Sequence, residues 1–173
     1  MNSIVMYEDK MQGVFELHTA EDLFAKLEHD FATLREDPGN SYAAFNFFVT
    51  AEHLLDWVYP GYENKKPRED LRNSELVLQI CSHIASGAKH FVAQAKQHDS
   101  VSGTRRPIVC QGGALPRCAF PVGGIPVGAL PGRWSPELHV ELSGDAANEL
   151  GNVIHVLELG GRVVEFWREY LKR

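Results

Sequence analysis

The sequence is poor in cysteine and has no CxxC pair. Its three cysteines are Cys81, Cys110 and Cys118, and its first residues lack the basic start and apolar stretch of a secretory signal. An odd number of cysteines without such a signal is typical of reduced thiols, so we expect a cytoplasmic protein without a disulfide framework. Cys81 falls within a helical apolar pattern, which indicates a buried structural cysteine.

Long apolar runs and an excess of positive charge are also absent. No stretch reaches the roughly 18 apolar residues that indicate a membrane-spanning helix. The 17 basic and 23 acidic residues give a net charge of −6. We therefore expect no membrane association and no general binding of nucleic acids, whose phosphates require a basic surface. With 173 residues, 44% of them hydrophobic and 23% charged, the chain suits a single domain over 1–173.

The common motifs of catalysis and cofactor binding are missing as well. The chain has no GxGxxG or GxxxxGKS/T phosphate loop, no GxSxG nucleophile turn and no HExxH metal-binding helix. The repeated Glu-x-x-His pair of di-iron helical bundles is also absent. We therefore predict neither a cofactor nor a bound metal, and the balance favours a protein that is not an enzyme.

What the sequence does contain is a regular series of prolines. The segment Gly113–Gly132, called the Pro/Gly ribbon below, reads GALPR-CAFPV-GGIPV-GALPG, with a proline every five residues. Proline removes a backbone donor and pushes the preceding residue to extended geometry, so the ribbon cannot be helical. The apolar residues that precede the prolines need a surface to pack on, in the same chain or in another copy. They are Leu115, Phe120, Ile125 and Leu130.

Apolar periodicity predicts a mainly α-helical protein around this ribbon. Apolar residues recur every three or four positions in four segments, as on the buried face of an amphipathic helix. We expect a four-helix-type bundle with a small β-hairpin and the irregular Pro/Gly ribbon inserted before the last helix. The expected helices cover about 19–37, 41–59, 70–97 and 146–172, and the ribbon and strands cover about 105–143.

Local signals refine this prediction. Thr19, followed three residues later by an acidic residue, is a typical helix start, and Asn40 or Ser41 can cap the second helix. The alternating hexamer at 137–142 predicts a half-buried strand. Gly87 lies inside the third expected helix, where a glycine favours close approach of another helix or of a ligand.

Two expected helices also carry a second, polar stripe. If the stripes of the second and third helices meet, His53, His83 and His90 line one cleft, with Asp56 and Lys89 at its edge. Histidine suits proton transfer near neutral pH, so these five residues are the candidate catalytic residues. Two alternatives are solvent-facing helix sides and a hydrogen-bonded polar interface without chemistry.

One spacing resembles that of helical ribonucleases of the HEPN type, whose motif joins an arginine to a histidine across four to six residues. Arg133 and His139 have this spacing, but Pro136 lies between them and the segment predicts a strand. The similarity to HEPN proteins is therefore one of helical architecture only.

Five segments occur together in this sequence: AEHLLDW at Ala51–Trp57, ICSHIASGAKHF at Ile80–Phe91, the Pro/Gly ribbon, the strand ELHVEL and VVEFW at Val163–Trp167. This set resembles a family of uncharacterised bacterial proteins. The resemblance covers roughly residues 40–170 and departs in the ribbon, where units with proline replace Gly-Phe units. It supports the layout above but implies no reaction. The residues to which it directs attention are His53, Asp56, Trp57, Lys89 and His90.

These observations favour a non-enzymatic interaction protein that self-assembles through the Pro/Gly ribbon into a homo-oligomer. A first alternative is a nucleic-acid-processing or hydrolytic helical enzyme that uses the histidine-rich cleft. A second alternative is a small-ligand binder with its site between the second and third expected helices, near Gly87.

Overall fold

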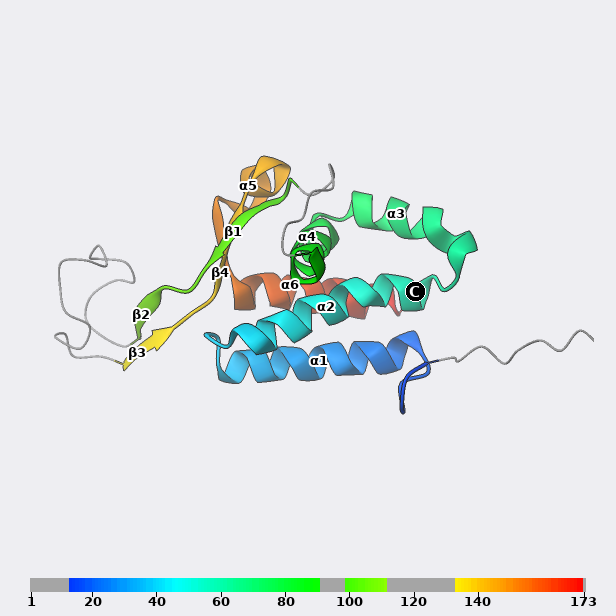
Figure 1. The fold of residues 1–173 in the computed structure, drawn as a ribbon, viewed down its shortest axis with the longest axis horizontal. Coiled ribbons are helices and arrows are strands. Elements are labelled where there is room, and N and C mark those ends of the chain that lie inside the picture. The colour runs from blue at the N-terminus through cyan, green and yellow to red at the C-terminus, as the bar shows by residue number, and fades with distance from the viewer. Residues whose placement is uncertain (1–12, 91–98, 112–132, 173) are drawn as a thin grey trace, which may run out of the picture.

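The described part of the protein is mainly α-helical, with two small antiparallel β-sheets. The computed structural model describes residues 13–90, 99–111 and 133–172 (Figure 1). Within them lie six α-helices, a short 3-10 helix η1 and five strands. In chain order they are α1 (Ala20–Glu36), α2 (Ser41–Val58), η1 (Tyr62–Asn64), α3 (Lys65–Ser74), α4 (Leu76–His90), β1 (Val101–Arg105), β2 (Ile108–Gln111), β3 (Arg133–Pro136), β4 (His139–Leu142), α5 (Gly144–Leu150), β5 (Val153–His155) and α6 (Val156–Tyr170).

The first two helices begin where local capping residues place them. Thr19 and Asp22 form a capping box, in which the Thr19 hydroxyl accepts the Asp22 N–H and the Asp22 carboxylate accepts the Thr19 N–H. The Asn40 side chain caps α2 by accepting the N–H groups of Tyr42 and Ala43. Both starts confirm the sequence prediction, because a cap depends only on residues within one turn.

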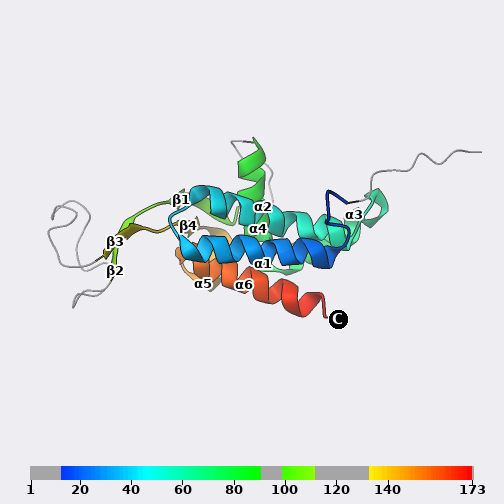
Figure 2. The same cartoon turned by 90° about the horizontal axis from the view of Figure 1, so that it is seen from below.

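Three helices run alongside one another and a fourth crosses them. α1 packs on α2 and on α6, while α4 packs across α2 and contacts α6 (Figures 1 and 2). Fully buried side chains fill the space between them, among them Leu27, Phe47, Leu54 and Trp167. Because α4 crosses the other helices, the four-helix bundle expected from the sequence is not confirmed in its detail. No helix in the described residues is long and apolar enough to cross a membrane.

The strands form a narrow arm that extends from the helices. β4 lies between β1 and β5 in a three-stranded antiparallel sheet, and β2 pairs with β3 beyond it (Figure 1). The Pro/Gly ribbon joins β2 to β3 in the sequence, but residues 112–132 lie outside the described residues. The predicted interaction residues Leu115, Phe120, Ile125 and Leu130 therefore lie outside them too.

The base of the arm is attached to the turn between α1 and α2. The Arg106 Nε donates to the Gly39 carbonyl at 2.7 Å, and the Leu138 N–H donates to the Pro38 carbonyl at 2.9 Å. Gly39 is buried there, and a Cβ atom on it would lie 2.5 Å from the Pro136 carbonyl oxygen. This position therefore requires glycine because the backbone of the arm approaches too closely for a side chain.

Two predicted helices need correction. The helix expected over 70–97 begins earlier, at Lys65, and is divided at Glu75, whose extended backbone (φ −123°, ψ 112°) separates α3 from α4. The helix expected over 146–172 is divided into α5, β5 and α6. Gly151 ends α5 at φ +86°, a left-handed conformation that glycine adopts readily. β5 then pairs with β4, an interaction that apolar periodicity does not reveal.

Gly160 allows α6 to pack closely on α1 and α2. A Cβ atom built on Gly160 would lie 2.7 Å from Phe31 Cε2 and 3.4 Å from Phe47 Cε1. The two phenyl rings contact each other, with centroids 5.6 Å apart, and Phe47 is fully buried. The same atom on the neighbouring Gly161 would lie 3.9 Å from Phe31, which is ordinary van der Waals contact.

We predict opposite effects of alanine at these two glycines. Gly160→Ala overpacks the contact with Phe31 and should lower the free energy of unfolding by about 1–3 kcal/mol. Gly161→Ala, the matched control, should raise it by up to about 1 kcal/mol, because alanine favours a helix over glycine. Urea unfolding followed by circular dichroism measures both changes. Equal effects of the two substitutions would show that close packing at Gly160 is unimportant.

Candidate functional site

A pocket opens where α2, α4 and the arm meet. Its volume is about 460 Å³, and Gly87 on α4 forms part of its wall. Helix α2 contributes Ser41, Ala44, Phe45 and Phe48; helix α4 contributes His83, Ile84, Gly87 and Ala88; the arm contributes Val101, Ser102, Gly103, Thr104, Leu138, His139 and Val140; and α6 contributes Val156.

The pocket wall is apolar apart from small hydroxyl groups and two imidazoles. His83 comes from α4 and His139 from β4, and no lysine, arginine or carboxylate occurs among the described residues that line the pocket. A Cβ atom on Gly87 would meet no described atom within 4 Å, so this glycine leaves space that a side chain would fill. The arrangement suits a ligand with an apolar body rather than a highly charged one.

His83 is positioned by β1. Its Nδ1 accepts the Val101 N–H at 3.0 Å and lies 3.4 Å from the Ser100 hydroxyl. Because Nδ1 is the acceptor, the proton of the neutral ring resides on Nε2. The same hydrogen bond attaches α4 to the first residue of β1, so the position of His83 is set by the fold and not by the helix alone.

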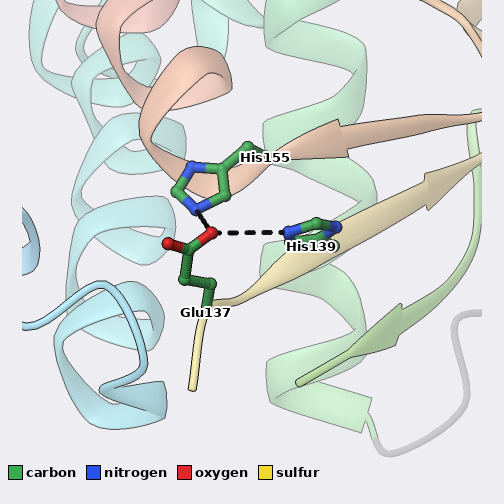
Figure 3. A group of neighbouring side chains, drawn as sticks. All are labelled: Glu137, His139 and His155. Atoms are coloured by element: carbon green, nitrogen blue, oxygen red, sulfur yellow. Dashed lines mark ion pairs between the residues drawn. The ribbon is translucent and has the colours of Figure 1, made fainter. Parts of the chain in front are cut away.

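Next to the pocket lies a cluster of Glu137, His139 and His155. Figure 3 shows both imidazoles pointing toward one carboxylate oxygen of Glu137. His155 Nε2 lies 3.1 Å from Glu137 Oε2, and His139 Nε2 lies 4.0 Å from the same atom. The Glu137 side chain is 5% exposed and the imidazoles 21% and 23%, so the three groups are largely shielded from water.

The fold brings the two histidines together through strand pairing. His139 on β4 is the direct partner of His155 on β5, and the rings are 5.1 Å apart in an edge-to-face contact. His155 also caps α6, because its Nδ1 accepts the Leu157 N–H at 3.1 Å. His139 belongs to both features, since it lines the pocket and lies in the cluster.

The residues proposed from the sequence lie in several places. His83 lines the pocket, whereas His53, Lys89 and His90 are exposed and are not among its lining residues. Asp56 is exposed and forms an ion pair with Arg68 of α3 at 2.8 Å. The pocket does lie between α2 and α4 beside Gly87, which is where the small-ligand interpretation expects it.

The sequence patterns did not single out Glu137 or His155, and they drew attention to His139 only through its spacing from Arg133. A signal for Glu137 and His139 is present, because residues i and i+2 of an extended segment lie on one face, and the Glu-x-His pattern therefore places both side chains together. No such signal exists for His155, which lies in the segment expected to be helical. Only the pairing of β4 with β5 brings this residue to the cluster.

A partly buried carboxylate, Glu52, lies between α2 and α3. Glu52 pairs with Arg72 at 2.8 Å and accepts a hydrogen bond from Ser82 at 3.3 Å. Burial raises the pKa of Glu52, although Arg72 and Ser82 act in the opposite direction. The neighbouring Cys81 is fully buried, as predicted, and burial together with Glu52 raises the pKa of its thiol, which keeps it protonated and unreactive. This region holds helices together.

Comparisons with protein-family models, with curated proteins and with solved structures found no match. The pocket and the cluster beside it are therefore the features from which a function can be inferred. These two features are adjacent and share His139.

The partly buried ion pair of Glu52 and Arg72 yields a prediction about pH. Burial raises the pKa of Glu52 in the folded protein above its pKa in the unfolded chain, which is near 4.5. Protonation of Glu52 therefore stabilises the folded protein fully below the unfolded-state pKa, and this stabilisation is lost as the pH rises through the folded-state pKa. Arg72 limits that loss. Arg72→Met should therefore lower the free energy of unfolding by about 1–3 kcal/mol at pH 7, and by less at pH 4, in urea unfolding.

A matched double variant serves as the control. Adding Glu52→Gln to Arg72→Met removes the unpaired charge and should abolish the difference between the two pH values. An equal loss for Arg72→Met at pH 4 and pH 7 would contradict the role given to the Glu52 carboxylate.

Proposed function

We propose that this protein binds a small, mainly apolar molecule in the pocket between α2, α4 and the arm. The observation that carries the proposal is the pocket itself, whose volume of about 460 Å³ falls within the roughly 300–1,000 Å³ typical of small-molecule sites. Its wall combines apolar side chains with a few polar groups, which is the composition such sites share.

The lining residues indicate the chemistry of the ligand. Phe45, Ile84 and Leu138 offer apolar surface, while His83 and His139 bring imidazole groups to the wall. Imidazole donates a hydrogen bond from its protonated nitrogen, so it suits an acceptor group such as a carboxylate or a carbonyl. The ligand class we propose is an apolar molecule with one such acceptor group, for example a medium-chain carboxylic acid.

Regular structure supports the pocket on each side. The His83 Nδ1 bond to Val101 connects α4 to β1, and β1 in turn pairs with β4. Phe48 and Val156 belong to the buried core. A pocket held by such contacts is already formed before the ligand binds. Binding therefore does not require a large loss of conformational entropy from the protein.

Gly87 provides the direct test. Gly87→Leu places a side chain where glycine leaves open space, and it should weaken binding of the dye ANS and of decanoate at least about tenfold. Gly87→Ala is the matched control, which should keep most of the binding and stabilise α4 by about 1 kcal/mol. Fluorescence titration measures the dye, and isothermal titration calorimetry measures decanoate.

Two outcomes would contradict this proposal. One is failure of the wild-type protein to bind either probe. The other is equal binding by Gly87→Leu and the wild type, which would place the probes elsewhere on the protein. Thermal unfolding of each variant establishes that a loss of binding does not come from loss of the fold.

A second candidate function is self-association through the arm, which is the function that the sequence favours. The supporting observation is that β2 and β3, which precede and follow the ribbon in the sequence, pair with each other beyond the helices (Figure 1). The apolar side chain of Ile108, at the start of β2, is 42% exposed, so the β2–β3 pair has exposed apolar surface of its own. Apolar surface of this kind is typical of contacts between protein chains.

Deletion of the ribbon tests self-association. We expect the full chain to elute as an oligomer in size-exclusion chromatography with light scattering. A variant in which residues 113–132 are replaced by a short Gly/Ser link should be a monomer at the same concentration. A full chain that is already monomeric would contradict this second candidate and would leave the ligand proposal unaffected.

A further inference from the structure

We propose that Glu137, His139 and His155 bind a divalent transition-metal ion, with zinc as the best fit. This inference goes beyond the proposed function, because it concerns a different ligand and does not require a molecule in the pocket. It also differs from the expectation of no metal, which rested on the absence of known metal-binding motifs in the sequence.

The spacing of the donor atoms fits a single ion. Glu137 Oε2 lies 3.1 Å from His155 Nε2 and 4.0 Å from His139 Nε2, and one donor atom from each residue lies within 4.8 Å of the others. Zinc bonds of about 2.0–2.2 Å in a tetrahedral arrangement place neighbouring donors roughly 3.4 Å apart. Small side-chain movements therefore bring all three donors to bonding distance.

The donor types select the class of metal. Two imidazoles and one carboxylate are the protein ligands of several zinc sites and of the two-histidine, one-carboxylate iron sites. Calcium and magnesium prefer sets of oxygen ligands, so a cluster with two nitrogen donors disfavours them. Among the transition metals, zinc needs no particular redox environment, and we take it as the probe.

The orientation of His155 also supports an ion. Its Nε2 is buried and makes no hydrogen bond with good geometry within the described residues, although Glu137 Oε2 is only 3.1 Å away. The ring thus faces the carboxylate, but its N–H direction does not meet the oxygen well enough for a hydrogen bond. An ion located between the carboxylate and the rings would satisfy this nitrogen.

Metal binding has one cost that provides a signature. His155 Nδ1 now accepts the Leu157 N–H, so the proton of the neutral ring is on Nε2. Coordination through Nε2 displaces this proton, and Nδ1 then carries one and can no longer accept the Leu157 N–H. Binding should therefore shift the backbone amide signal of Leu157 in NMR spectra, while the capping amides of α2 stay unchanged.

Three protein ligands leave room for another ligand on the ion. Zinc sites closed by four protein ligands are structural, whereas sites with three protein ligands and an open position are typical of catalysis. Because His139 also lines the pocket, the ion would lie beside the pocket wall. The described residues therefore place an ion site with an open position next to a cavity that can hold a small molecule.

The test uses the untagged full chain after removal of metal with a chelator. Titration with zinc in a calorimeter should show one ion per chain, and cobalt should give the visible spectrum of a site with nitrogen ligands. His139→Asn and His155→Asn should each reduce zinc affinity at least about tenfold. Asparagine at position 155 preserves a helix cap, so this variant removes the imidazole and keeps the start of α6.

His53→Asn is the matched control, since His53 is exposed and lies outside the cluster. It should leave zinc affinity unchanged. The proposal is overturned if the wild type binds no zinc, or if zinc affinity and the cobalt spectrum are the same in His155→Asn as in the wild type. Decanoate binding by metal-free His155→Asn distinguishes failure of the zinc proposal from failure of the ligand proposal. His155 does not line the pocket, so this variant should bind decanoate as the wild type does if the ligand proposal holds.

Discussion

Both candidate sites depend on two backbone hydrogen bonds made by Leu138. Its N–H donates to the Pro38 carbonyl in the turn between α1 and α2, and its carbonyl accepts the Val156 N–H at the start of α6, each at 2.9 Å. The chain is therefore held on both sides at this residue. Because its neighbours are Glu137 and His139, the same two bonds position the carboxylate and one imidazole of the cluster.

Strand register completes the arrangement. The pairing of β4 with β5 places His155 opposite His139, and a shift by one residue would turn one of the two side chains to the other face of the sheet. Strand β4 also contributes His139 and Val140 to the pocket, whose other walls are α2 and α4. A ligand in the pocket and an ion in the cluster would thus be close neighbours, although different contacts hold each.

Much of the helical structure follows from short-range signals. Capping residues at Thr19 and Asn40 define the starts of α1 and α2, because the orphan N–H groups of a first turn find partners within three residues. The prediction failed for 146–172, where an apolar pattern close to a helical period continues through α5, β5 and α6. Apolar periodicity indicates only which residues are buried. A short paired strand between two helices buries residues at positions that also fit a helical period.

The sequence by itself determined a mainly helical protein with an arm that interrupts it, because caps, apolar spacing and proline act on neighbouring residues. A small-ligand site near Gly87 was one alternative that the sequence left open, because glycine within a helix favours a close approach, and a pocket lies there. Only the tertiary structure decided which polar residues meet. Glu137 and His155 become neighbours of each other and of His139 through strand pairing and the Leu138 hydrogen bonds. These are long-range interactions that no local sequence pattern encodes.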